Sequence, residues 1–120
     1  MNQELTAQES HYLAMNIVGE ALEKEDYEFL AINSSLKKNP QFVTLKNKET
    51  FFILVRSVFS SAELKQPQNI NLEPIIAHAK KNNAKVFYAG VWLGHGLDIN
   101  KPILKEEDYS FVYNGLKEVV

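Results

Sequence analysis

Residues 40–57 read Pro-Gln-Phe-Val-Thr-Leu-Lys-Asn-Lys-Glu-Thr-Phe-Phe-Ile-Leu-Val-Arg-Ser, and this stretch decides the fold. Two runs, 41–46 and 50–57, flank the polar segment Asn47-Lys48-Glu49, a pattern that predicts a β-hairpin. The second run is apolar from Phe51 to Val55 and leads into Arg56, the only arginine of the chain. Because strand ends carry the chemistry of many α/β folds, we expect functional residues near this hairpin.

Before the hairpin, the sequence predicts one helix and one strand. Thr6 and Glu9 have the spacing of a capping box, in which each side chain accepts from the other residue's backbone amide. Apolar residues then recur with helical spacing, which predicts an amphipathic helix over 7–25. Residues 27–33 read as a strand with apolar groups on both faces, and we expect both faces to be partly covered.

After the hairpin, the sequence predicts a loop, a second helix and two more strands. Asn71 is a good N-cap for a helix over 72–82, with Pro74 in its first turn and Asn82-Asn83 at its end. Residues 85–93 are apolar on both faces, which is typical of a central buried strand. We expect Gly94-His95-Gly96 to end this strand, and an edge strand over 109–113 to end at Asn114-Gly115.

The predicted fold is an α/β (α+β) domain with the order α-β-β-β-α-β plus a C-terminal edge strand. A strand reached through a helical crossover implies a mixed sheet with helices packed on it, in three layers. With 120 residues, the chain has the length of one compact domain, residues 1–120.

Composition excludes several classes of function. The formal net charge is −2, and 12 of the 13 basic residues are lysines, a balance that argues against a dedicated nucleic-acid binder. The absence of cysteine excludes disulfides, zinc–thiolate sites and iron–sulfur clusters. Neither a signal peptide nor an apolar run long enough to span a membrane is visible, and we expect a cytoplasmic protein.

The order of elements and the local residues resemble the restriction-endonuclease-like, or PD-(D/E)xK, superfamily, and within it the small bacterial branch similar to Holliday-junction resolvases. The similarity runs from about Leu13 to Leu93. Its marks are Leu22, Tyr27, the segment Leu-Ala-Ile-Asn at 30–33 and the hairpin strand Phe-Ile-Leu-Val-Arg-Ser at 52–57. The resemblance implies a restriction-endonuclease-like three-layer fold.

In that superfamily, Asp and Glu on the hairpin and Glu on the first helix bind Mg²⁺, and a Lys positions the nucleophile. The matching positions here are Met15, Gln41, Leu54 and Arg56. The metal-binding carboxylates are therefore replaced, and we expect no cofactor. A relocated carboxylate, Glu20, is the open alternative, and only that reading calls for Mg²⁺.

Some small bacterial proteins that resemble this chain are labelled subunits of a Na⁺-translocating NADH–quinone reductase. Such a subunit needs cysteines for an iron–sulfur cluster, and this chain has none.

Other chemistry-bearing residues form no recognised motif. His11, His78 and His95 lack metal-ligand spacing. His95 is the one at a possible site edge, and we expect His11 on the surface of the first helix. Lysines at 37–38, 46–48 and 80–81 suit solvated turns as well as a basic rim. Among the aromatic residues, we expect Phe87, Tyr88 and Trp92 in the core, and the face formed by Tyr109, Phe111 and Tyr113 suits edge-to-edge dimerisation.

These residues lead to one functional prediction and two alternatives. We expect a non-catalytic protein with a nuclease-like fold that acts as a binding or assembly module, with a protein partner or as a homodimer. One alternative is a metal-dependent nuclease with a relocated site that uses Glu20 and Arg56. The other is a weak nucleic-acid-binding protein, whose affinity would fall steeply with salt.

Overall fold

A computed structural model of the chain describes residues 5–35, 38–58, 64, 71–95 and 109–119. Two of its helices are α1 (Ala7–Lys24) and α3 (Glu73–Lys81). The strands are β1 (Glu28–Ile32), β2 (Phe42–Lys46), β3 (Glu49–Val58), β4 (Ala84–His95), β5 (Tyr109–Tyr113) and β6 (Lys117–Glu118). The predicted order α-β-β-β-α-β with a C-terminal edge strand is confirmed, and β6 was not predicted.

The strands form one mixed sheet in the order β1-β2-β3-β4-β5, with β6 beside β4. The pairs β1–β2 and β2–β3 are antiparallel, as are β4–β5 and β4–β6. β3 and β4 are parallel over nine residue pairs, and α3 makes the crossover between them. A parallel pair needs such a connection, because its strands cannot be joined by a tight turn.

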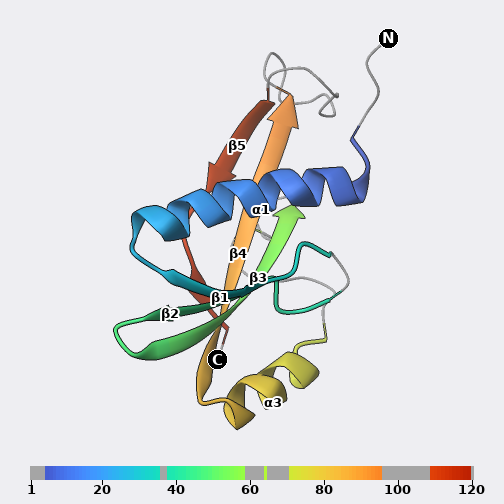
Figure 1. Cartoon of the computed structure of the whole chain (residues 1–120). Helices are drawn as coiled ribbons and strands as arrows, with labels where there is room; N and C mark the ends of the chain where they lie inside the picture. Colours follow the sequence, from blue (N-terminus) through green and yellow to red (C-terminus); the bar gives the residue numbers. More distant parts are fainter. Residues whose placement is uncertain (1–4, 36–37, 59–63, 65–70, 96–108, 120) are drawn as a thin grey trace.

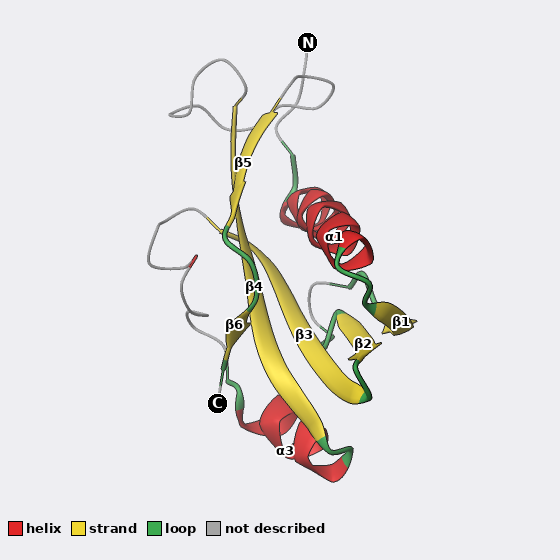
Figure 2. Ribbon diagram, turned by 90° about the vertical axis from the view of Figure 1, so that its left-hand side faces the viewer, coloured by secondary structure: helices red, strands yellow, loops and turns green. Residues whose placement is uncertain are grey.

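The two helices lie on opposite faces of the sheet (Figures 1 and 2). On one face, Met15, Val18 and Leu22 of α1 pack against Ile53 and Val55 of β3 in a cluster that β4 completes. On the other face, a second cluster joins α3 to alternate residues of β3 and β4: Phe52, Leu54, Ile75, Ala79, Val86 and Tyr88. The domain therefore has three layers, with the sheet between α1 and α3. Tyr88 lies in the core, as predicted.

α1 begins at the predicted capping box. The Thr6 hydroxyl accepts from the Glu9 amide at 3.1 Å, and the Glu9 carboxylate accepts from the Thr6 amide at 2.9 Å. Two of the amides that lack a partner in the first helical turn are thereby paired. The predicted N-cap at Asn71 was one residue early, because α3 begins at Glu73 and Leu72 is its N-cap; the Asn71 side chain still accepts from the Glu73 amide at 3.2 Å.

The hairpin between β2 and β3 turns at Asn47 and Lys48, which have φ angles of 52° and 67°. Two consecutive residues with positive φ match the right-handed twist of the strands that they join. Lys46 and Glu49 close the ladder beside the turn. The predicted hairpin is therefore present, with a turn one residue shorter than expected.

β5 spans the predicted residues Tyr109–Tyr113, whereas β4 extends two residues beyond the predicted range 85–93. β4 continues through Gly94 to His95, because Gly94 pairs with Ser110 of β5 and its missing side chain makes room for the Trp92 ring. The last strand resumes after Gly115, whose φ is 87°. Tyr113 pairs with Val91 of β4, and Lys117 pairs with Tyr88. The C-terminal segment thus advances four residues while β4 advances three, and one extra residue on one strand is typical of a β-bulge.

The expectation that β1 is covered on both faces was also wrong. β1 is an edge strand, and Leu30 and Ile32 are 52% and 62% exposed. The pairing with β2 shifts register between Phe29 and Ala31, which leaves Leu30 without a partner on β2. Within β1, Phe29 packs against the α1 cluster, as does Tyr27 just before the strand.

Candidate functional site

The structure brings together two of the four positions that match the nuclease motif. Gln41 lies just before β2 and contacts Arg56 near the end of β3. Leu54 is buried against α3 on one face of the sheet, whereas Met15 is buried against β3 and β4 on the other. Met15 and Leu54 are therefore core residues on opposite sides of the sheet.

The fully buried side chain of Gln41 connects the loop before β2 to β3. Its Oε1 accepts from the Val55 amide at 2.9 Å and from Arg56 Nη1 at 3.1 Å. Its Nε2 lies 3.0 Å from the Lys38 carbonyl, 3.1 Å from Asn39 Oδ1 and 3.3 Å from the Ser35 carbonyl. The backbone amide of Gln41 donates to Ile53, so the side chain extends the β2–β3 ladder by one further bond.

Arg56 is half-buried and bonds to neutral oxygens. Nη1 donates to Gln41 Oε1 and, at 2.7 Å, to the Val55 carbonyl, and Nη2 donates to Asn39 Oδ1 at 2.7 Å. Burial lowers the pKa of the guanidinium, and the nearby Tyr88 phenol opposes this shift. Arg56 thus places a positive charge at the sheet end beside the loop that Gln41 closes.

His11 is the member of this site that sequence reasoning missed. The predicted surface position was wrong, because His11 is 0% exposed. Neither ring nitrogen has a hydrogen-bond partner among the residues that the structure describes. Burial, with the charge of Arg56 as the second cause, lowers the pKa of His11 to about 4.

A signal for this burial exists in the sequence. His11 stands four residues before Met15, seven before Val18 and eleven before Leu22, so it continues the buried stripe of α1 by one turn. We call His11, Asn39, Gln41 and Arg56 the Arg56 cluster.

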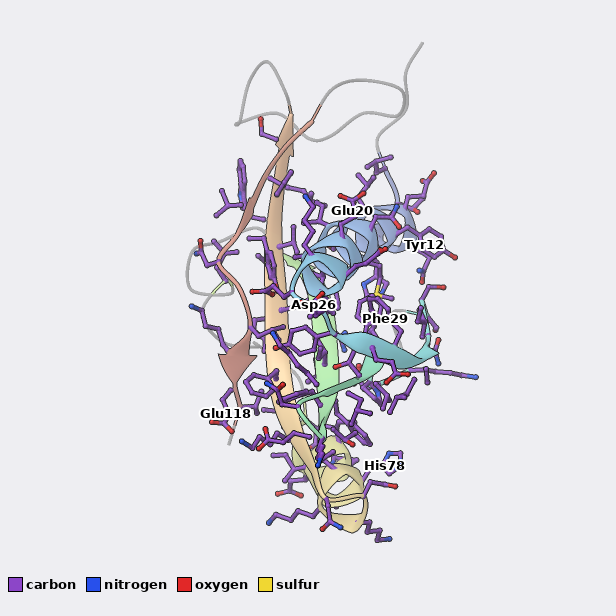
Figure 3. All side chains as sticks on the ribbon, turned by 60° about the vertical axis from the view of Figure 1, so that its left-hand side comes forward. Tyr12, Glu20, Asp26, Phe29, His78 and Glu118 are labelled. Carbon is purple, nitrogen blue, oxygen red and sulfur yellow. The ribbon has the colours of Figure 1, made fainter. Side chains whose placement is uncertain are left out.

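Glu20 lies elsewhere on α1. It lines a groove of about 280 Å³ between α1 and β5, together with Asn16, Ile17, Ala21, Lys24, Phe111 and Tyr113. Nine residues separate Glu20 from His11, which is about 13 Å along a helix axis. Figure 3 shows Glu20 on α1, and the structure does not bring it to Arg56.

The residues at the motif positions do not suit Mg²⁺. This ion prefers several oxygen ligands, carboxylates above all, and here Gln41 offers one amide oxygen that already accepts two hydrogen bonds. In the described parts of the chain, no three His, Cys, Asp or Glu residues lie close enough together to hold a metal ion. Lys37 and the side chain of His95 lie outside the described residues, so a role for His95 stays a prediction.

Some of the surface lysines make contacts within the domain. The Lys46 ammonium lies 4.7 Å from the centroid of the Tyr27 ring, and the Lys85 ammonium lies 3.4 Å from the Glu49 carboxylate. These contacts fit the reading of the lysines as ordinary surface residues. No helix in the part of the chain that the structure describes has both the length and the apolar character needed to cross a membrane.

These observations define the protein as a small α+β domain with two described helices and a mixed six-stranded sheet. The chain belongs to the family described as Domain of unknown function (DUF8840), whose model matches residues 8–119. Comparison with curated proteins gave no significant match, and comparison with solved structures gave none either.

Proposed function

We propose that this chain is a non-catalytic member of the restriction-endonuclease-like superfamily that works as a binding or assembly module. The order of the elements supports the fold assignment. A helix packs on three antiparallel strands, and a helical crossover then adds a parallel strand beside the third.

The observation that carries the loss of catalysis is the bonding of Gln41. Its amide spans the loop and β3 and has no acceptor capacity to spare for a metal. Leu54, at the second ligand position, is fully buried among apolar side chains of the α3 face. A carboxylate at that position would have to lose its hydration in an apolar core, at a cost of several kcal/mol.

Calorimetric titration with Mg²⁺ and Mn²⁺, together with a plasmid-nicking assay, tests this proposal. We expect neither saturable binding heat nor nicking. Saturable metal binding with nicking that Glu20→Gln and Arg56→Gln both abolish would establish the relocated nuclease instead. Glu23→Gln is the matched control, because it removes a carboxylate from an exposed position of the same helix.

The assembly role is supported by apolar side chains on the two open edges of the described sheet. β1 exposes Leu30 and Ile32, and β5 exposes Phe111 and Val112 by 52% and 40%. Edge strands with exposed apolar groups pair readily with another chain. A homodimer or a protein partner therefore fits this surface better than nucleic acid does, since the net charge is −2.

A further inference from the structure

The segment between β5 and β6 contains the only Asn-Gly pair of the chain, Asn114-Gly115. In such a pair, the backbone nitrogen of the glycine can attack the side-chain amide carbon of the asparagine and close a succinimide ring. Glycine favours this step, because it has no side chain to hinder the ring and its backbone is conformationally free. The sequence of this segment therefore permits a spontaneous modification of the main chain.

The structure leaves Asn114 accessible for this reaction. Its side chain is exposed, and the residue lies outside the regular pairing of β5 and β6. The amide of Asn114 has no hydrogen-bond partner among the described residues. A Cβ atom placed on Gly115 would meet nothing within 4 Å, so the space around the attacking nitrogen is open. Packing therefore does not hold the reacting atoms apart.

Two other exposed asparagines are held by hydrogen bonds. Asn33 is followed by a small residue, serine, but its Oδ1 accepts from the Ser35 amide at 3.0 Å. Asn82 donates through Nδ2 to the His78 carbonyl at 2.9 Å. Such bonds oppose the rotation that ring closure requires. Asn114 combines a following glycine with a side chain that no described hydrogen bond restrains.

The pairing of β6 depends on the length of the backbone that precedes it. β6 joins β4 through two residue pairs, in a register that the bulge at Gly115 sets. Beyond them, the Val119 amide donates to the Val86 carbonyl at 3.0 Å, and the Val119 side chain packs against the cluster on the α3 face. A longer backbone between β5 and β6 would displace all of these contacts.

We propose that Asn114-Gly115 is a site of spontaneous deamidation that detaches β6 from β4. The Gly115 nitrogen forms a bond to Asn114 Cγ, the Cγ–Nδ2 bond breaks, and Nδ2 leaves as ammonia with the proton of the Gly115 amide. Water then opens the ring without oxidation or reduction. Opening at Cγ gives aspartate, and opening at the backbone carbonyl carbon gives isoaspartate.

The two products have different effects on the sheet. Aspartate restores the original backbone and adds a negative charge at an exposed position, so β6 keeps its register. Isoaspartate routes the main chain through the former side chain and lengthens it by one carbon, so β6 no longer matches β4. This modification is independent of the proposed loss of nuclease activity and of the assembly role.

Incubation of the full chain at pH 6 and at pH 8.5, followed by peptide mapping with mass spectrometry, tests the reaction. We expect the mass gain of an NH2-to-OH exchange at Asn114, faster at pH 8.5 because the attacking nitrogen must lose its proton. Asn33 is the matched control, and it should react at least about tenfold more slowly, because its hydrogen bond must break first. An unmodified Asn114, or equal rates at the two positions, would overturn the proposal.

NMR signals and amide hydrogen exchange of Val119 test the detachment of β6. Isoaspartate-containing protein should lose the protection of this amide, whereas Asn114→Asp, which carries only the charge, should keep it. Asn114→Gln should stay unmodified and protected through the same incubation, since glutamine closes the corresponding larger ring far more slowly. Native signals of Val119 in the isoaspartate form, or equal loss of protection in Asn114→Asp, would refute the detachment.

Discussion

Gln41 and His11 show how one buried polar residue is accommodated and another is not. The amide of Gln41 bonds to the loop and β3 through both of its polar atoms. The imidazole of His11 is equally buried but has no hydrogen-bond partner among the described residues, and burial favours its neutral form. We therefore expect the first residue to stabilise the domain and the second to make its stability depend on pH.

Gln41→Glu tests the structural role of the amide. The change keeps the shape but replaces the Nε2 donor with an oxygen that faces the carbonyls of Ser35 and Lys38. We expect the free energy of unfolding to fall by about 2 kcal/mol in urea denaturation at pH 7. Asn16→Asp, an amide-to-acid change at an exposed position of α1, should alter it by less than about 0.5 kcal/mol. Equal effects of the two changes would show that the bonding of Gln41 is not special.

The pKa of His11 predicts a loss of stability in acid. The folded-state value is about 4, below the ordinary value of 6.5, so the unfolded chain binds more protons between these limits. The contribution of His11 is complete above pH 6.5 and is lost as the pH falls toward 4, by at most about 3 kcal/mol.

Urea denaturation of wild type and His11→Phe from pH 7.5 to 4 measures this loss. The variant should be less sensitive to acid than the wild type over that range. His78→Gln is the control, because His78 is an exposed histidine on α3 (Figure 3). If His11→Phe and the wild type lose stability in parallel, the buried imidazole is not the cause.

Among the elements, α1 depends on both a local signal and a distant contact. Its capping box lies within residues 6–9, whereas its apolar face is buried only by packing against β3 and β4. The helix also meets the loop after β1, because Gln8 Nε2 donates to the Ser34 carbonyl at 2.9 Å. The first turns of α1, which carry His11, are thereby joined to the loop between β1 and β2.

Removal of the N-cap tests how strongly this helix start is held. Thr6→Ala leaves the Glu9 amide without its side-chain acceptor, and we expect a loss of about 1 kcal/mol in the free energy of unfolding. Thr6→Ser keeps a hydroxyl at the cap and should restore most of that stability. Equal destabilisation by alanine and serine would show that the cap hydrogen bond contributes little.

For the molecule as a whole, the proposed assembly role depends on the two end strands of the described sheet. β1 and β5 lie at opposite ends of the described sheet (Figure 2), and neither has a second neighbouring strand among the described residues. A C2 dimer uses one edge twice, whereas contact between unlike edges builds an open chain of molecules.

Sedimentation equilibrium distinguishes these forms of assembly. We expect concentration-dependent self-association that Ile32→Lys or Phe111→Lys weakens, because a charge on an edge strand opposes pairing. If only one of the two variants abolishes self-association, the assembly is a closed dimer that uses one edge twice. If each variant abolishes self-association, unlike edges pair and the molecules form an open row. Lys80→Glu, at an exposed position of α3, is the control. A wild-type protein that stays monomeric at all concentrations would contradict the homodimer.

Local chemistry was sufficient to predict much of this fold from the sequence. The capping box at Thr6, the hairpin turn near Asn47 and the end of the second helix at Asn82-Asn83 each depend on residues close together in the chain. The two-sided apolar strand that became β4 followed from its composition, because a strand in the middle of a sheet is covered on both faces.

Tertiary structure decided the rest, because those features depend on contacts between distant residues. Leu30 became exposed since β1 lies at the edge of the sheet, and His11 became buried since α1 lies over the sheet and the loop before β2. The strands within residues 40–57 were predictable from the sequence, but the hydrogen bonds of the Gln41 side chain were not. Its amide meets Val55 and Arg56 only after the hairpin has formed, so a position at which the resemblance implies a metal ligand is occupied by a side chain that holds the loop to β3.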